Sequence, residues 1–142
     1  GRALEGAPDG PLADLYAGIG LFAGTVGGGR QVIAVERDRD AMADAKVNVP
    51  DARIIRSAVE RWRPSPAVAV VADPARSGLA AAGVEKVVAT GASHVALVSC
   101  DAGSLGRDAA LLVGQGYRLE WSTLVDLFPH TPHVEVVSRF VR

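Results

Sequence analysis

The stretch Asp14-Leu15-Tyr16-Ala17-Gly18-Ile19-Gly20-Leu21-Phe22-Ala23 decides the fold, because it places a glycine turn between a buried strand and a helix. Glycines let the backbone turn tightly and approach a ligand at the N-terminus of the helix that follows. Gly18, Gly20 and Ala23 satisfy the G-x-G-x-x-A form of the dinucleotide fingerprint. Glu36 ends the next apolar run, where a carboxylate can accept hydrogen bonds from ribose hydroxyls. The stretch therefore predicts a nucleotide-type site, with a turn that only connects two elements as the alternative.

Two ligand classes fit this pattern, a nicotinamide dinucleotide and S-adenosylmethionine. Asp14 lies four residues before Gly18, and an acidic group is favourable beside a cationic sulfonium but unfavourable beside a pyrophosphate. The chain also shows no obvious second mononucleotide-binding half. We therefore expect S-adenosylmethionine as the cofactor, held by the Gly18–Gly20 turn and Glu36, and keep a small nicotinamide-dependent oxidoreductase as an alternative.

Val- and Ala-rich runs alternate with helical patterns along the rest of the chain. Apolar runs without polar alternation predict strands buried on both faces, as in parallel sheets. The expected strands are residues 12–16, 32–35, 53–55, 68–72 and 95–98, followed by two β-type runs over 117–127 and 133–141. Helices are expected around Met42, Val84 and Leu105, where apolar residues recur at helical spacing. This order predicts a three-layer α/β sandwich with about five parallel strands and a closing antiparallel pair.

Two further polar segments follow expected strands. Asp73 stands in Ala72-Asp73-Pro74-Ala75-Arg76-Ser77-Gly78, and Cys100 stands in Val98-Ser99-Cys100-Asp101. Ligands of open α/β sheets bind outside the carboxyl ends of the strands, so both residues are expected at the same edge as Gly18 and Glu36. The alternatives are a helix cap for Asp73 and an inert buried thiol for Cys100. A position before a helix N-terminus favours a thiolate.

The stretch Asp126-Leu127-Phe128-Pro129-His130-Thr131-Pro132-His133-Val134-Glu135 is dense in polar and rigid residues. A carboxylate and two histidines near a turn can serve acid–base chemistry. Metal binding by His130 and His133 is disfavoured because no further ligand is evident, so no metal site is expected.

Taken together, these segments resemble the RNA (uracil-5-)methyltransferase family, whose members make 5-methyluridine in transfer or ribosomal RNA. The resemblance runs from about Leu12 to Phe140. The matching pieces are Asp14-Leu15-Tyr16-Ala17-Gly18-Ile19-Gly20-Leu21-Phe22, Val35-Glu36 with Ala41, Ala45 and Asn48, Asp73-Pro74-Ala75-Arg76-Ser77-Gly78, Val98-Ser99-Cys100 with Leu105, Arg107 and Asp108, Gly116-Tyr117, and Asp126-Leu127-Phe128-Pro129-His130-Thr131 with His133-Val134-Glu135.

The resemblance implies a fold, a cofactor and a mechanism. The fold is a Rossmann-like class I S-adenosylmethionine-dependent methyltransferase fold, with a mostly parallel seven-stranded sheet and a C-terminal antiparallel hairpin. Cys100 matches the nucleophile that adds to carbon 6 of uracil, and Glu135 matches the base that removes the carbon 5 proton. The target base must leave its stack to reach the thiol. The positions that match the cofactor contacts are Tyr16, Gly18, Gly20, Leu21, Glu36 and Asp73.

The chain departs from the family pattern at several points. Asp101-Ala102 stands where the family usually has Asn-Pro, and an acidic residue there disfavours a thiolate on Cys100. Ala58 stands where a polar residue often contacts adenine. The family's N-terminal RNA-binding region and iron–sulfur ligands have no counterpart in residues 1–142, which we expect to be the catalytic domain alone. These departures motivate a second hypothesis, a methyltransferase-like binding module without turnover.

Composition supports an ordinary globular protein. The chain has 142 residues, a net charge of -1 and 49% hydrophobic residues. No apolar run approaches the roughly 20 residues of a membrane helix, and Gly1 to Pro11 lack a secretory-signal pattern. The single cysteine excludes an internal disulfide, and the near-neutral net charge does not indicate a broad basic surface for nucleic acid. We expect a cytoplasmic protein with an RNA substrate and no membrane partner. Recognition of that RNA is expected to need the N-terminal region.

Overall fold

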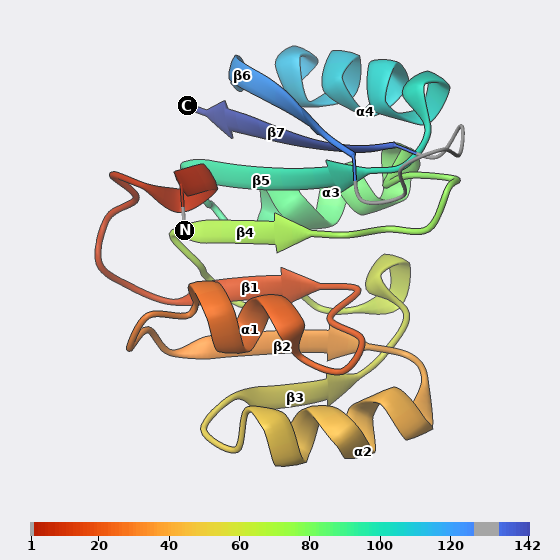
Figure 1. Cartoon of the computed structure of the whole chain (residues 1–142). Coiled ribbons are helices and arrows are strands. Elements are labelled where there is room, and N and C mark those ends of the chain that lie inside the picture. Colours follow the sequence, from red (N-terminus) through yellow and green to blue (C-terminus); the bar gives the residue numbers. More distant parts are fainter. Residues whose placement is uncertain (1, 127–133) are drawn as a thin grey trace.

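A seven-stranded sheet forms the centre of the molecule, in the order β3-β2-β1-β4-β5-β7-β6 (Figure 1). The computed structural model describes residues 2–126 and 134–142. Strands β1 to β5 are parallel, whereas β7 is antiparallel to both of its neighbours, β5 and β6. The strands are β1 (Leu12–Leu15), β2 (Val32–Glu36), β3 (Arg53–Arg56), β4 (Ala69–Ala72), β5 (His94–Ser99), β6 (Arg118–Val125) and β7 (Glu135–Val141).

Helices cover both faces of the sheet and give it two apolar cores. Because side chains alternate along a strand, Ala13 and Leu15 of β1 enter one core cluster and Leu12 enters the other. The larger cluster lies under η2 (Val59–Arg61), α3 (Ala80–Ala89) and α4 (Ala102–Gly114). The smaller cluster lies under η1 (Arg2–Leu4) and α1 (Leu21–Val26), and α2 (Arg39–Asn48) flanks α1 in Figure 1. The expected three-layer arrangement is confirmed.

The expected strands and helices appear close to their predicted positions. Helix α2 buries Met42 and Ala45, and α3 buries Val84 and Val87, as their apolar spacing predicted. The expected turn of the closing pair falls largely within residues 127–133, outside the described residues. The pairing itself is confirmed, but the sequence did not predict that β7 inserts between β5 and β6. That insertion separates this topology from the dinucleotide-binding order 3-2-1-4-5-6.

Within the part of the chain that the structure describes, no helix combines the length and the apolar character needed to cross a bilayer.

Candidate functional site

A cleft of about 350 Å³ opens at the carboxyl ends of the parallel strands. This is the edge at which open α/β sheets bind ligands. Tyr16, Glu36 and Asp73, which the sequence predicted as cofactor contacts, come from the ends of β1, β2 and β4 and meet in this cleft. The lining residues are Tyr16, Val35, Glu36, Arg37, Ser57, Ala58, Val59, Glu60, Asp73, Ala75, Ser77 and Gly78.

The glycine turn is connected to the cleft by a hydrogen bond from Gly18 to the lining residue Glu36. The φ of Gly18, 53°, lies in the left-handed region, and its N–H donates to Glu36 Oε2 at 2.9 Å. Gly20 begins α1 with a φ of 87°, and a Cβ there would come within 2.8 Å of Val49 Cγ2. None of the predicted contacts Gly18, Gly20 and the exposed Leu21 is among the described residues that line the cleft. In this structure, Gly20 therefore allows the start of α1 to approach Val49, the residue that follows α2.

Three backbone N–H groups hold the carboxylate of Glu36. Besides the Gly18 contact, Oε1 accepts from the N–H groups of Arg37 and Asp38, both at 2.7 Å. A carboxylate has about four acceptor positions, so one remains for a further donor. Glu36 is thus a fixed, negatively charged acceptor at the end of β2, suited to a ligand hydroxyl.

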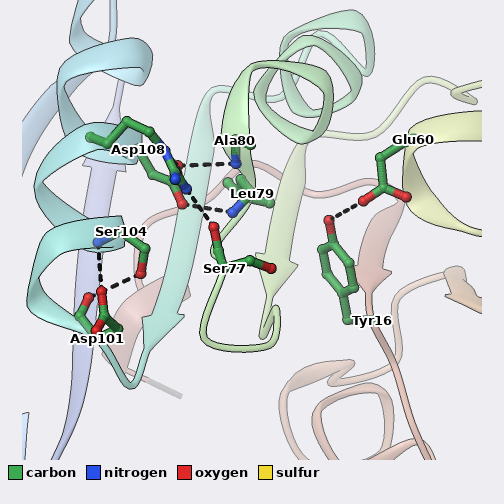
Figure 2. A network of polar contacts seen from close by, with 9 residues as sticks. Tyr16, Glu60, Ser77, Leu79, Ala80, Asp101, Ser104 and Asp108 are labelled. Atoms are coloured by element: carbon green, nitrogen blue, oxygen red, sulfur yellow. Dashed lines mark hydrogen bonds and ion pairs between the residues drawn. The ribbon is translucent and has the colours of Figure 1, made fainter.

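Tyr16 spans the cleft from β1 toward η2. Its hydroxyl donates to Glu60 Oε1 at 3.1 Å, and Figure 2 shows the two side chains pointing toward one another. Burial, with the Glu60 carboxylate as the next cause, raises the pKa of Tyr16 well above its usual value, so the hydroxyl stays a donor. The φ of Tyr16 is 61°, an uncommon conformation for a residue other than glycine. Such strain is concentrated at ligand sites.

Two carboxylates, Asp73 after β4 and Glu135 at the start of β7, lie near enough to influence each other's charge. Partial removal from water raises the pKa of Asp73 to about 6, and the nearby carboxylate of Glu135 adds to the rise. Excess negative charge at this edge favours a cationic ligand group. A ligand with an ammonium group would fit here better than one with a phosphate.

Cys100 follows β5 directly and is half-buried. Ser99 pairs with Val136 in the antiparallel register of β5 and β7. Cys100 and Glu135 are each one position beyond that pair, so they lie at the same end of the two strands. The sequence predictions for nucleophile and base thus fall at one sheet edge, next to Asp73.

Asp101 has a local role that the sequence did not reveal. Its carboxylate caps α4 by accepting from the Ser104 N–H at 2.8 Å, and Arg76 lies 3.9 Å away. The hydrogen bond from Ser104, followed by smaller contributions that include the Arg76 charge, lowers the pKa of Asp101. The acidic neighbour of Cys100 therefore has a structural reason to be acidic.

The sequence predicted that Asp14 lies beside the cationic sulfonium of the cofactor, but the structure places its side chain away from the cleft. The side chain is fully buried beneath α1, and Oδ2 accepts from the Ala23 N–H at 2.8 Å. It is absent from the described lining of the cleft. Side chains alternate along β1, so Asp14 faces the smaller core while its neighbour Leu15 faces the larger one. Asp14 joins β1 to α1, and the negative charge available to a cationic ligand group comes instead from Asp73 and Glu135.

Sequence reasoning overlooked part of the cleft. Ser57 stands beside Ala58 in the lining, so a hydroxyl is present next to the expected adenine-contact position. Arg37 and Glu60 also line the cleft, and both follow strand ends that the sequence had predicted. Their position one to four residues beyond a strand end was the available signal.

Part of the predicted chemistry lies outside the described residues. His130 and His133 belong to that stretch, so their acid–base role stays a prediction. Among residues 2–126 and 134–142, no group of three His, Cys, Asp or Glu side chains is arranged to hold a metal ion.

Comparisons with known proteins agree with this geometry. An uncharacterised RNA methyltransferase of Bifidobacterium longum is 38% identical over 98% of this chain and 35% of its own length. The 23S rRNA (uracil(1939)-C(5))-methyltransferase RlmD of Pseudomonas putida is 36% identical over 91% of this chain and 31% of its own. No protein-family profile matches the chain.

A solved structure extends the similarity to three dimensions. The tRNA (uracil-54, C5)-methyltransferase of Pyrococcus abyssi, crystallised with S-adenosyl-L-homocysteine, superposes with a TM-score of 0.87 at 28% identity. The match covers 99% of this chain and 36% of that protein. The chain thus spans about a third of the length of these relatives. By fold, it is a class I methyltransferase domain, and by sequence it is similar over nearly its whole length to one part of RNA (uracil-5-)methyltransferases.

Proposed function

We propose that residues 1–142 form the catalytic domain of an S-adenosylmethionine-dependent methyltransferase that acts on carbon 5 of uridine in RNA. One observation carries the proposal: Glu36, Asp73, Cys100 and Glu135 all lie along the same edge of the sheet. The names of the homologous enzymes support RNA uracil as the substrate class. We also propose a cytoplasmic location.

The cleft has the chemistry that S-adenosylmethionine needs. Glu36 retains acceptor capacity for ribose hydroxyls, and the apolar side chains of Val35, Ala58 and Val59 offer a surface to adenine. Asp73 supplies negative charge for the ammonium group of the methionine part. When bound, the cofactor supplies a methyl group on a cationic sulfur. The relative crystallised with S-adenosyl-L-homocysteine supports this choice over a dinucleotide.

Cys100 and Glu135 divide the covalent chemistry between them. Carbon 5 of uracil is a poor nucleophile, and addition of the Cys100 Sγ to carbon 6 makes carbon 5 electron-rich enough to accept a methyl group. Glu135 then takes the proton from carbon 5, and the electron pair of that C–H bond expels the thiolate from carbon 6. The carboxylate need not be a strong base, because the adduct activates that proton. This sequence restores both side chains once Glu135 releases its proton.

The RNA presents a separate requirement. The base must flip out of a stack or come from an open loop to reach Cys100. The chain has a net charge of -1, so broad electrostatic attraction to phosphates is weak. We infer that RNA recognition depends on parts of the larger relatives that this chain does not match.

A trapping experiment tests the proposal. Residues 1–142 alone and a longer chain with the rest of the relatives' length are each incubated with S-adenosylmethionine and tRNA or 23S rRNA transcripts that contain 5-fluorouridine. The longer chain is the form expected to engage RNA. Fluorine at carbon 5 replaces the proton that the base would remove, so the covalent adduct persists. The expected result is a denaturation-resistant protein–RNA complex that Cys100→Ala abolishes, while binding of S-adenosylhomocysteine is unchanged. Glu135→Gln should instead accumulate the complex on ordinary uridine RNA. A complex that persists in Cys100→Ala would refute the assigned nucleophile. Cofactor binding without any complex, even in a longer chain with the rest of the relatives' length, would favour the non-catalytic module.

A further inference from the structure

The loop that follows Asp73 is held by a residue from a different part of the chain. Asp108 lies in α4, and its side chain is fully buried. Oδ2 accepts from the Leu79 N–H at 2.6 Å, and Oδ1 accepts from the Ala80 N–H at 3.1 Å. Figure 2 shows both contacts converging on the one carboxylate. Asp108 therefore caps the start of α3 from another helix.

The backbone at this point needs such support. Leu79 precedes α3 and provides no side-chain cap of its own. Gly78 has a φ of 71° and Ala80 a φ of 52°, which is strained for alanine. A Cβ on Gly78 would overlap the carboxylate of Asp108, so the loop and α4 are in close contact. A strained turn persists only where its surroundings hold it.

Arg107 completes the contact from the solvent side. Its guanidinium bonds Asp108 Oδ1 at 2.8 Å and also donates to the carbonyl oxygen of Ser77. The side chain of Arg107 is 46% exposed, whereas that of Asp108 is 1% exposed. A buried carboxylate with a charged partner and two backbone donors is fully compensated.

This arrangement connects the two sides of the proposed active site. Ser77 and Gly78 line the cleft, and Asp73 begins the same loop. Helix α4 starts just after Cys100, and its second turn carries Asp108. The first turn of α3 also approaches Tyr16, since a Cβ on Gly83 would lie 3.3 Å from the Tyr16 hydroxyl. One helix thus fixes the Asp73 loop relative to the cysteine.

We propose that Asp108, supported by Arg107, is a positioning residue that holds the Asp73–Gly78 loop in the conformation that binds the cofactor. The inference rests on the proposed function, because it concerns the affinity of that cleft. Asp108 itself is not among the described residues that line the cleft. Its effect passes through the backbone of Ser77 to Ala80.

Asp108→Asn tests the inference against a matched control. The asparagine amide has the size of the carboxylate but no charge. Its NH2 group would face a backbone N–H group of Leu79 or Ala80, so one hydrogen bond is lost. Tyr117→Phe removes a different buried hydrogen bond, from the Tyr117 hydroxyl to the Ala92 carbonyl at 2.7 Å, without touching the cleft. Both variants are titrated with S-adenosylhomocysteine at a temperature where each is fully folded, and amide exchange is followed by NMR. Arg107→Ala is the second variant, because its exposed side chain makes it the safer one for folding.

We expect Asp108→Asn to weaken the affinity about tenfold or more, which corresponds to the loss of one charge-assisted hydrogen bond. The Leu79 and Ala80 amides should exchange faster, Arg107→Ala should show a smaller loss, and Tyr117→Phe should bind as the wild type does. Equal affinity in Asp108→Asn and Tyr117→Phe would overturn the inference and leave the proposed function intact. If the wild-type chain binds no S-adenosylhomocysteine, the proposed cofactor site fails for this chain, and with it the role in cofactor binding. The amide exchange rates then decide only whether Asp108 orders the loop.

Discussion

Replacement of Asp14 by asparagine should make the protein more stable at neutral and alkaline pH. Asp14 is fully buried, and its Oδ1 has no hydrogen-bond partner within the described structure. Burial raises its pKa from 3.8 to about 7, against the opposing effect of the Ala23 N–H; Asp73 and Glu36 add to the rise. The folded protein therefore binds a proton that the unfolded chain has already lost between pH 4 and 7.

The sign and size follow from proton linkage. Because the folded-state pKa is the higher one, the stability associated with the protonated group is complete below pH 4 and is lost as pH rises through 7. A rise from 3.8 to about 7 corresponds to ~4 kcal/mol in the free energy of unfolding. Asparagine keeps an acceptor for the Ala23 N–H and carries no charge at any pH.

Urea denaturation of the wild type and Asp14→Asn from pH 4 to 8.5 measures the effect. The free energy of unfolding of Asp14→Asn, relative to that of the wild type, should increase by ~4 kcal/mol over this pH range. Ser138→Ala is the control, since it removes a buried, non-ionising hydroxyl that bonds Ser122 at 2.8 Å. The free energy of unfolding of Ser138→Ala should differ from that of the wild type by the same amount at every pH. A constant difference for Asp14→Asn as well would refute the assignment of a strongly shifted, buried carboxyl.

Three further changes probe the site. Glu36→Gln should weaken binding of S-adenosylhomocysteine about tenfold in calorimetry, because an amide has one acceptor oxygen for three backbone donors; unchanged affinity would contradict the role. Asp101→Asn should retain the cap on Ser104 and leave the melting temperature within a few degrees, while adduct formation becomes faster; slower trapping would argue that the negative charge is needed. Gly20→Ala should destabilise the fold by ~1–3 kcal/mol in urea denaturation, because its Cβ meets Val49 and its φ is 87°; full stability would exclude the close approach.

The layered fold could be predicted from the sequence because its signals are local. The uninterrupted apolar runs, such as Val32–Glu36 of β2, indicate buried parallel strands, and the helical stripes appear where expected. The edge that carries the site follows directly, because parallel strands end together. Glu36, Asp73 and Cys100 could therefore be assigned to one edge of the sheet from the sequence alone.

The remaining features depend on long-range packing. No local sequence pattern indicates the structural roles of Asp14 and Asp108. Each carboxylate acquires its role from the backbone N–H group that it meets only in the folded chain. The same limit hid the position of β7 between β5 and β6, because a hairpin pattern does not specify which strand faces the sheet. Asp14 does not reach the cofactor cleft as the sequence predicted, because a strand end has two faces and this carboxylate is on the face away from the cleft.

Calorimetric titration of the 142-residue chain with S-adenosylhomocysteine, with NADH as the parallel ligand, tests the central claim most directly. The account predicts saturable one-to-one binding of S-adenosylhomocysteine and none of NADH, since the cleft presents Glu36, Glu60 and Asp73 to its ligand. Binding of NADH in preference to S-adenosylhomocysteine would contradict the account and restore the dinucleotide interpretation of the Gly18–Gly20 turn. Binding of neither ligand would contradict the claim that these residues alone form a working cofactor site.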